Sequence, residues 1–532
     1  MERRAFLRTA TIAAAAGLAP RPDEALAAAT ALPQAPGFEL EELTVAELQE
    51  GMTRGRWTAR GLAEQYLSRI GAIDRNGPRL GSIIEINPDA LRLADELDVE
   101  RRGQGSRGPL HGIPVVVKDN LDSGDRMRTS GGSLALELGT APRDSDAVDR
   151  LRRAGAVLLG KTNLSEWANF RSTRSTSGWS AVGGQTRNPY VLDRNPCGSS
   201  SGSGAAAAAN FAAVAIGTET DGSIVCPSAI CGVVGIKPTV GLVSRTGIIP
   251  ISATQDTAGP MCRTVADAAV VLMAIQGYDP RDPATGPMRT RIARDYTQVL
   301  RADGLSGARL GIARKGFGLP SSIEPVLAEA IAACKDAGAV LVDPAEVPNV
   351  DKLGDPEFEV LLYEFKQGMA DYLATRGAEP RSLEDLIRFN TEHREREMPW
   401  FGQEIFEQAA KKGPLTDAAY RRARGTCRRL SRTLGIDAIM ATHRLDAVVA
   451  ITTGPAWPTD YVNGDRYTGG CSTAAAVAGY PHVTVPAGFL HGLPIGLSFF
   501  GRAWSEATLI RLAYAFEQAT RARKPPGFKP SI

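Results

Sequence analysis

The chain has 532 residues, of which 43% are hydrophobic and 23% charged, and its formal net charge is +2. This near-neutral balance gives no reason to expect nucleic acid or an anionic surface as a partner. The length fits one large α/β domain, and no stretch after the N-terminal region has the roughly 20 apolar residues that a membrane helix requires. We therefore expect no membrane anchor, while the sequence leaves the oligomeric state open, with a monomer plausible.

The N-terminal residues have the pattern of a targeting segment. Arg3 and Arg4 precede the apolar run 10–19, which is too short to span a bilayer. Small residues with cleavage sites of the A-x-A kind follow it. We therefore expect residues 1–31 to be a twin-arginine-type signal peptide that is removed, and residues 32–532 to be exported already folded, to the periplasm or the medium. An alanine-rich N-terminal helix is the alternative.

Helix and strand patterns then alternate along the chain. Thr44 has the capping-box spacing to Glu47, and Thr58 precedes an amphipathic helix. The β-branched run 113–118 predicts a strand that ends at Lys118. Further helices are expected at 145–154, 164–170, 205–209, 264–276, 325–337 and 507–520. Further strands are expected at 156–159, 211–216, 232–236, 309–313, 339–342, 447–451, 483–485 and 497–500.

This alternation predicts the fold class. It favours a single large α/β domain with a mixed, mostly parallel β-sheet that helices cover on both faces. Residues 353–432 are polar and mostly helical in pattern, so we expect them to form a helical cap within the domain.

The stretch 195–227 carries the candidate chemistry. A loop rich in glycine and serine leads through a small-residue helix and an apolar strand to a second tight turn. Glycine lets backbone amides approach a ligand closely, and ligands usually bind at strand ends in open α/β sheets. The apolar helix and strand argue against a flexible Gly/Ser linker. Ser199 and Ser223 are therefore the candidate reactive side chains.

A serine hydroxyl is a weak nucleophile until a base takes its proton. No histidine lies near either serine in the sequence. A lysine serves instead when burial lowers its pKa from about 10.4. Lys118, at the end of an apolar strand, is the candidate base, although a surface lysine is the alternative reading of the same position. Asp119 would oppose the pKa shift if it faced the amine, so we expect it to point away.

Residues 198–202, GSSSG, also fit the G-x-S-x-G nucleophile elbow, which would make Ser200 the nucleophile. That elbow should follow a strand directly. Here the preceding residues are turn-like, and Pro196 argues against a central strand. The elbow is the weaker interpretation.

Seven cysteines are scattered along the chain, and the five histidines show no metal-binding spacing. Without a C-x-x-C pair or an H-x-x-x-H spacing, we expect neither a metal nor another cofactor. Cys226 and Cys231 are the nearest pair in sequence and could approach one another, but buried free thiols are the favoured interpretation.

Many segments, in order, resemble the amidase signature family. They include HGIPVVVKDN at 111–120, GKTNLSEWANF at 160–170, CGSSSGS at 197–203, TETDGSIVCPSA at 218–229 and QDTAGPM at 255–261. The serine-rich segments are similar to the branch that includes bacterial peptide amidases. The usual family pattern has glycines at Cys197, Ser201 and Asp221 and an arginine at Val225, and these departures leave the substrate preference open.

The resemblance implies a role for each site residue. Ser223 matches the nucleophile, Ser199 the bridging serine that follows a cis peptide bond, and Lys118 the base. The backbone amides of the second turn match the oxyanion hole, which comprises Thr220, Asp221, Gly222 and Ser223.

The resemblance also implies an amide hydrolase that works through an acyl-enzyme and releases ammonia from a carboxamide. A small-molecule or short-peptide amide is the implied partner, above all the C-terminal amide of peptides, with amino-acid and aryl amides as alternatives. A subunit of a tRNA-dependent amidotransferase shares the signature, but its need for cytoplasmic aminoacyl-tRNA conflicts with the expected export and with the near-neutral charge. A non-catalytic binding protein on the same fold conflicts with the intact Lys118, Ser199 and Ser223.

Overall fold

The computed structural model describes residues 37–291, 294–315, 317–377 and 380–532. Residues Glu39–Ile532 form one compact unit. The expected signal peptide, residues 1–31, lies outside the described residues. Within the described ranges, no helix combines the length and apolarity needed to cross a membrane.

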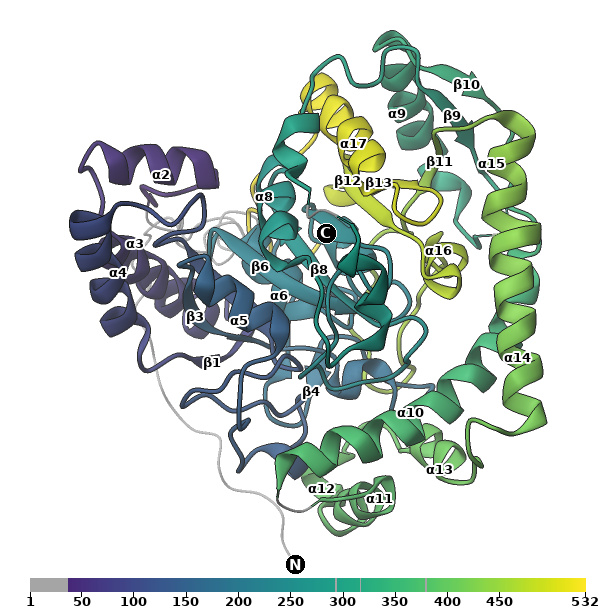
Figure 1. Ribbon diagram of the computed structural model, residues 1–532, viewed down its shortest axis with the longest axis horizontal. Helices are drawn as coiled ribbons and strands as arrows, with labels where there is room; N and C mark the ends of the chain where they lie inside the picture. The colour runs from purple at the N-terminus through teal and green to yellow at the C-terminus, as the bar shows by residue number, and fades with distance from the viewer. Residues whose placement is uncertain (1–36, 292–293, 316, 378–379) are drawn as a thin grey trace, which may run out of the picture. The chain divides into compact units, whose positions relative to one another are not determined.

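A mixed sheet of 11 strands runs through the unit in the order β1-β3-β2-β6-β8-β7-β12-β13-β11-β9-β10 (Figure 1). Its strands are β1 (Ile83–Ile86), β2 (Pro114–Lys118), β3 (Val157–Thr162), β6 (Val214–Glu219), β7 (Val234–Lys237), β8 (Thr257–Cys262), β9 (Arg309–Ile312), β10 (Val340–Val342), β11 (Ala447–Ile451), β12 (His482–Leu490) and β13 (Leu493–Phe500). A separate hairpin pairs β4 (Trp179–Ser180) with β5 (Gly184–Gln185).

The expected α/β class and mixed sheet are confirmed, but the expected excess of parallel pairs is wrong. Four of the ten pairings in the large sheet are parallel and six are antiparallel. The parallel pairs join β3, β2 and β6 on one side and β11, β9 and β10 on the other. The strands between them alternate in direction, because antiparallel neighbours need only a turn or loop between them, as in the β12–β13 hairpin.

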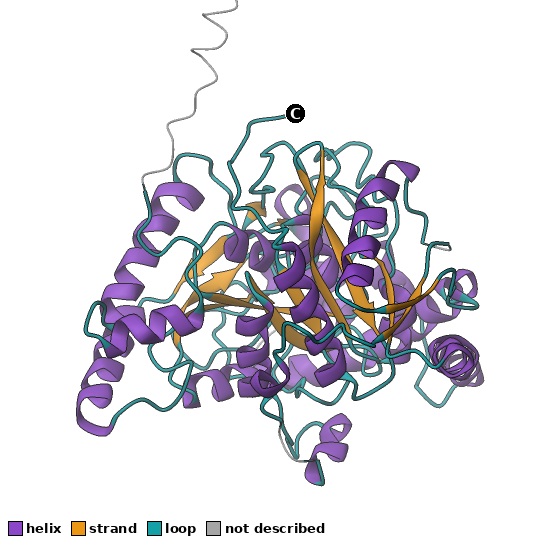
Figure 2. Cartoon of the chain, turned by 90° about the horizontal axis from the view of Figure 1, so that it is seen from above, coloured by secondary structure: helices purple, strands orange, loops and turns teal. Residues whose placement is uncertain are grey.

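Helices lie on both sides of the sheet (Figure 2). The α-helices of the described residues are α2 (Val45–Thr53), α3 (Ala59–Arg69), α4 (Ala90–Gln104), α5 (Asp146–Arg153), α6 (Ser201–Ala208), α7 (Val225–Ile230), α8 (Val265–Ile275), α9 (Glu324–Asp336), α10 (Gly354–Arg376), α11 (Leu383–Glu392), α12 (Arg394–Glu397), α13 (Glu404–Ala410), α14 (Ala418–Arg428), α15 (Asp437–His443), α16 (Ser472–Ala478) and α17 (Glu506–Thr520). The expected capping box is present at α2, where Thr44 and Glu47 exchange side-chain and backbone hydrogen bonds.

One expected helix is absent. Residues 164–170 contain only a short 3-10 turn, η3 (Glu166–Asn169), in which Trp167 and Ala168 have φ values of 50° and 54°. An α-helix requires negative φ, so the chain turns here instead. The turn buries the Trp167 ring against Phe406 of α13, with ring centroids 5.7 Å apart.

Residues 353–432 are largely helical and contain α10 to α14, seen at the lower right of Figure 1. Phe365 of α10 and Phe406 of α13 pack into one apolar cluster with Trp167 and Phe170. The region therefore packs against loops that follow the strands, among them those that carry Trp167 and Ile249.

Candidate active site

Lys118 is the last residue of β2, a central strand between β3 and β6. Its side chain is fully buried. Its Nζ donates to Ser199 Oγ at 2.7 Å and to Thr218 Oγ1 at 2.9 Å. Burial lowers the pKa of Lys118 to about 7, against the opposing charges of Asp256 and Glu219. The amine is thus held where it can be neutral near pH 7, as a base requires.

Asp119 points away from this amine, as expected. One of its carboxylate oxygens accepts from the Ser130 backbone N–H at 3.2 Å and also from the Ser130 hydroxyl. The other lies 3.9 Å from Nζ of Lys161, a second buried lysine. Burial raises the pKa of Asp119 to about 6. Its charge is therefore directed toward Lys161 and leaves Lys118 free of a contacting carboxylate.

Ser199 lies in the loop before α6, and the Gly198–Ser199 peptide bond is cis, as the resemblance implies. The neighbouring Ser200 hydroxyl is engaged by the backbone of β6. It donates to the Thr218 carbonyl at 3.0 Å and accepts from the Thr218 N–H at 3.2 Å. Residues 186–200, all of which the structure describes, contain no strand that leads into this loop. The Ser200 hydroxyl is thus a structural group, and the nucleophile-elbow interpretation is not supported.

Ser223 lies in the turn that follows β6 and is 9% exposed. Its carbonyl accepts the Ser200 N–H at 3.2 Å, which joins the two serine-bearing loops. The fold thus brings Lys118 and Ser199 into direct contact and places Ser223 on the adjoining loop. Across the described ranges, no hydrogen bond links the Ser199 and Ser223 hydroxyls.

The turn after β6 presents backbone donors. Within the part of the chain that the structure describes, no protein acceptor takes a hydrogen bond from the amides of Thr220, Asp221, Gly222 or Ser223. Gly222 has a φ of +77°, and a Cβ there would lie 3.1 Å from Ser472 Oγ. Only glycine adopts this conformation without strain, so the turn depends on it.

Side chains hold this turn from both sides. The Thr220 hydroxyl donates to Asp256 at 2.6 Å. The Asp221 carboxylate accepts from the hydroxyls of Ser472 at 2.5 Å and Thr473 at 2.7 Å, both in α16. Burial raises the pKa of Asp256 to about 6 and also raises the pKa of Asp221. These contacts fix the turn without using its backbone N–H groups.

Glu219, the last residue of β6, fixes the start of the following helix. Its carboxylate accepts the N–H groups of Ile224 at 2.8 Å and Val225 at 3.0 Å. Burial raises the pKa of Glu219, which lies near the buried Lys237. The residues directly after Ser223 are therefore anchored back to the strand.

An open cavity of about 500 Å³ borders both serine-bearing loops. Its lining includes Gly198 and Gly222 from those loops. Phe358 of α10 and Ile405 of α13 bring the helical region 353–432 into its wall. Three more aromatic side chains complete its apolar lining: Phe170, Trp457 and Tyr467.

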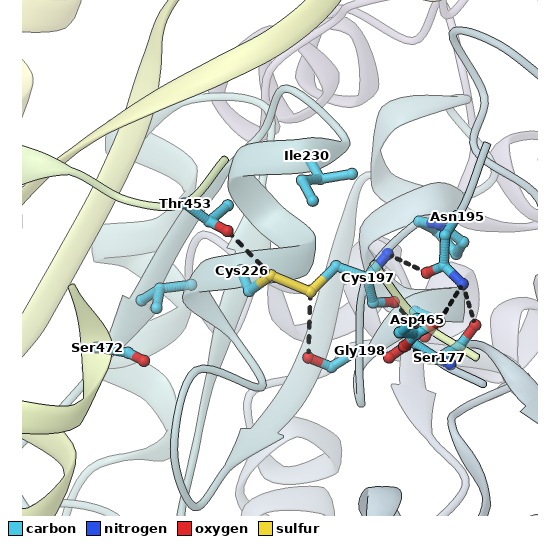
Figure 3. The surroundings of a disulfide bond; sticks show 12 residues. Ser177, Asn195, Cys197, Gly198, Cys226, Ile230, Thr453, Asp465 and Ser472 are labelled. Atoms are coloured by element: carbon cyan, nitrogen blue, oxygen red, sulfur yellow. Dashed lines mark hydrogen bonds between the residues drawn. A yellow bond between two sulfur atoms is a disulfide. The ribbon is translucent and has the colours of Figure 1, made fainter. Parts of the chain in front are cut away.

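The cysteine pairing differs from the one considered from the sequence. A disulfide joins Cys197 to Cys226 (Figure 3), with a Cα–Cα distance of 6.2 Å. Cys231 is a buried free thiol. Cys226 and Cys231 are five residues apart along α7 and its C-terminal cap. At 3.6 residues per turn they point in different directions, so nearness in sequence does not bring them together.

Sequence reasoning missed several partners of the proposed catalytic groups. Thr218 receives hydrogen bonds from both Lys118 and Asn120, and Asp256 holds Thr220. Thr218 lies within the TETDGS segment and Asp256 within QDTAGPM, so the sequence motifs could have pointed to both residues. The pairing of β6 with β2 brings Thr218 to Lys118, and the pairing of β6 with β8 brings Thr220 to Asp256.

Residues 62–510 match the family model described as Amidase. The chain therefore belongs to the amidase family and is a hydrolase of that family. Among solved structures it is similar to the native peptide amidase from Stenotrophomonas maltophilia, with 55% sequence identity and a TM-score of 0.89 over 92% of this chain and 100% of that one.

The chain is also similar to more distant relatives, which share less of its sequence. A probable amidase of Arabidopsis thaliana is 41% identical over 501 residues, 92% of each chain. A glutamyl-tRNA(Gln) amidotransferase component of Thermoanaerobacter pseudethanolicus is 34% identical over 508 residues, which cover 92% of this chain and 99% of that one.

Proposed function

We propose that this hydrolase releases ammonia from the C-terminal carboxamide of peptides through an acyl-enzyme on Ser223. The observation that carries the proposal is the buried contact between Lys118 Nζ and Ser199 Oγ, 2.7 Å long, beside the loop that carries Ser223. A lysine whose pKa is about 7 can accept a proton at neutral pH.

The reaction proceeds by proton relay. Neutral Lys118 takes a proton from Ser199, and Ser199 takes one from Ser223 as the Ser223 Oγ attacks the amide carbonyl. The free N–H groups of the turn 220–223 stabilise the oxyanion, and one such donor contributes about 3 kcal/mol in the transition state. The protons return along the same path to the leaving ammonia, and water then hydrolyses the acyl ester.

The substrate assignment rests on the similarity to the S. maltophilia peptide amidase and on the cavity. An apolar, aromatic wall beside the serine loops accommodates amino-acid side chains that precede the carboxamide. A tRNA-dependent amidotransferase, by contrast, would act only with an aminoacyl-tRNA. We infer export from the N-terminal pattern alone.

Paired serine variants test the proposal on a synthetic peptide with a C-terminal carboxamide. The wild-type protein should release ammonia and raise the peptide mass by about 1 Da, leaving internal peptide bonds intact. Ser223→Ala should abolish ammonia release and keep the native fold, because its hydroxyl serves only acyl transfer. Ser200→Ala, the matched control, should retain most of the turnover. An active Ser223→Ala with a dead Ser200→Ala would overturn the proposal, and internal fragments would overturn the substrate assignment.

A further inference from the structure

The Cys197–Cys226 disulfide joins the loop that carries Ser199 to the first turn of α7, the helix that follows the Ser223 turn (Figure 3). Cys197 lies two residues before Ser199, and Cys226 lies three residues after Ser223. The Cys226 N–H also donates to the Gly222 carbonyl at 2.8 Å. The bridge therefore links the chain just after the turn 220–223, whose amides form the proposed oxyanion hole, covalently to the loop that carries Ser199.

Little else ties these loops to one another. Between residues 195–200 and 220–226, all of which the structure describes, one hydrogen bond is present, from the Ser200 N–H to the Ser223 carbonyl at 3.2 Å. Close by, the Ser200 hydroxyl bonds to the Thr218 backbone near the end of β6, and the Cys231 thiol at the end of α7 donates to the Pro196 carbonyl at 3.7 Å. Neutral hydrogen bonds each contribute little net stability, whereas the bridge is covalent, so it is the stronger constraint on the separation of the loops.

The backbone at Cys197 supports a dedicated role for this cysteine. Its φ is +59°, in the left-handed region that glycine adopts without strain. The usual pattern of the family that the sequence resembles has a glycine at this position. A cysteine here carries a conformational cost that the bridge to Cys226 explains.

We propose that the Cys197–Cys226 disulfide is a positioning device for catalysis: it holds Ser199 and Ser223 in the geometry that proton transfer between them needs. The inference rests on the proposed function, since it assumes that these two serines form the relay. Turnover then depends on the oxidation state of the bridge.

An added dithiol can reduce the Cys197–Cys226 disulfide. Two thiol groups of dithiothreitol give up two electrons and two protons as the reagent closes to its cyclic disulfide. The S–S bond breaks, and Cys197 and Cys226 each become a thiol. Both cysteines are 5% exposed and line the open cavity, which gives a small reductant a route to them.

The first experiment compares the oxidised and reduced wild-type enzyme. Thiol titration of the unfolded protein should count five free cysteines before reduction and seven after it. Reduction should lower kcat about 10- to 100-fold on an amidated peptide, because small misplacements of reacting groups carry penalties of this size. KM should change little, and reoxidation should restore kcat.

A second readout follows the reactivity of the Ser223 hydroxyl without substrate, through its sulfonylation. Phenylmethanesulfonyl fluoride should modify Ser223 in the oxidised enzyme, and mass spectrometry of the peptide that contains it gives the rate. Reduction should slow this modification by the same factor as kcat. A role limited to holding the fold together would change the unfolding temperature but not this rate in the folded enzyme.

Three cysteine variants complete the test. Cys197→Ser and Cys226→Ser should both behave like the reduced wild type and ignore dithiothreitol. Cys334→Ser is the matched control: it alters a buried free thiol in α9, outside the lining of this cavity, so it should match the oxidised wild type and still lose activity on reduction.

The outcomes separate this inference from the proposed function. A seven-thiol enzyme with unchanged kcat and unchanged Ser223 modification overturns the positioning role, as does an effect confined to KM. Seven thiols in the untreated exported enzyme overturn it too. If oxidised enzyme is not modified at Ser223, or Ser223→Ala remains active, the proposed function itself fails, whatever the cysteines do.

Discussion

At the scale of single residues, the site depends on the contrast among three buried lysines. Lys161 Nζ is bound by the Leu121 carbonyl at 2.6 Å and the Thr129 hydroxyl at 2.9 Å, and it faces Asp119. Lys118 instead contacts the Ser199 hydroxyl and no carboxylate. Burial lowers the pKa of Lys237 to about 8, but its hydrogen bond goes to a backbone carbonyl. Burial lowers the pKa of Lys161 as well, but its hydroxyl partner is Thr129, whereas Lys118 contacts Ser199, whose loop adjoins that of Ser223.

This contrast predicts the pH dependence of turnover. A base works in its unprotonated form, and the pKa of Lys118 is about 7. The kcat/KM for an amidated peptide should therefore rise with pH through about 7 and stay high under mildly alkaline conditions, because more of the amine is neutral there. Lys118→Ala should lower kcat about 10²- to 10⁴-fold, and the rise of kcat/KM around pH 7 should disappear.

Lys118→Arg provides the control for charge. A guanidinium stays protonated at every accessible pH and cannot accept a proton, so this variant should be as inactive as the alanine variant. Near-normal turnover with an unchanged pH profile would show that position 118 supplies only a fixed positive charge.

At the scale of elements, α10 supplies part of the cavity wall from outside the sheet. Phe358 lines the cavity and packs edge-to-face on Phe170, with ring centroids 6.2 Å apart. Phe358→Ala should raise KM for peptide amides with an apolar last residue about 10-fold and leave kcat nearly unchanged, because it removes apolar contact from substrate and transition state alike. Steady-state kinetics over a panel of amidated peptides measures both constants.

Phe389→Ala is the matched control for this prediction. Phe389 belongs to α11 in the same helical region and stacks on His393 with ring centroids 4.0 Å apart, away from this cavity. Its loss should leave KM unchanged. Equal effects of the two variants would mean that the helical region acts on the cavity only through its general stability.

The elements near the site also show how far the sequence can be interpreted. The strand that ends at Lys118 is predictable, since a short β-branched run has one favoured structure. The strand β8 is not: Thr257–Cys262 contains Gly259 and Pro260, which normally argue against a central strand. It forms because β6 and β7 flank it on both sides. The Cys197–Cys226 pair, 29 residues apart, likewise depends on where the two loops meet in the fold.

At the scale of the whole molecule, the disulfide restricts the conformations of the unfolded chain as well as the geometry of the site. It closes a loop of 29 residues. By loop-closure entropy, such a link lowers the entropy of the unfolded chain and adds about 3.5 kcal/mol to the free energy of unfolding. Denaturant unfolding of the reduced enzyme should show a loss of this order with an intact native fold. A loss below about 1 kcal/mol would mean that the surrounding packing already constrains both loops.

The compartment in which the chain folds decides whether this bridge forms. Disulfides persist in the bacterial periplasm and are rare in the cytoplasm, where thiols are kept reduced. The Arg3–Arg4 pair predicts twin-arginine export, which carries folded chains. The enzyme would then fold with free thiols at Cys197 and Cys226 and acquire the bridge only after it leaves the cytoplasm.

Replacing Arg3 and Arg4 by lysine tests this order of events in a bacterium with a twin-arginine pathway. Wild-type protein should appear in the periplasm without residues 1–31 and with five free thiols, since two of its seven cysteines are bridged. The double variant should remain in the cytoplasm at full length with all seven thiols, because reducing conditions oppose the bridge. Its turnover should rise on oxidation in vitro to that of the exported enzyme. Equal periplasmic yields of both proteins would contradict the export prediction, and a retained protein with five thiols would show that the bridge forms without export.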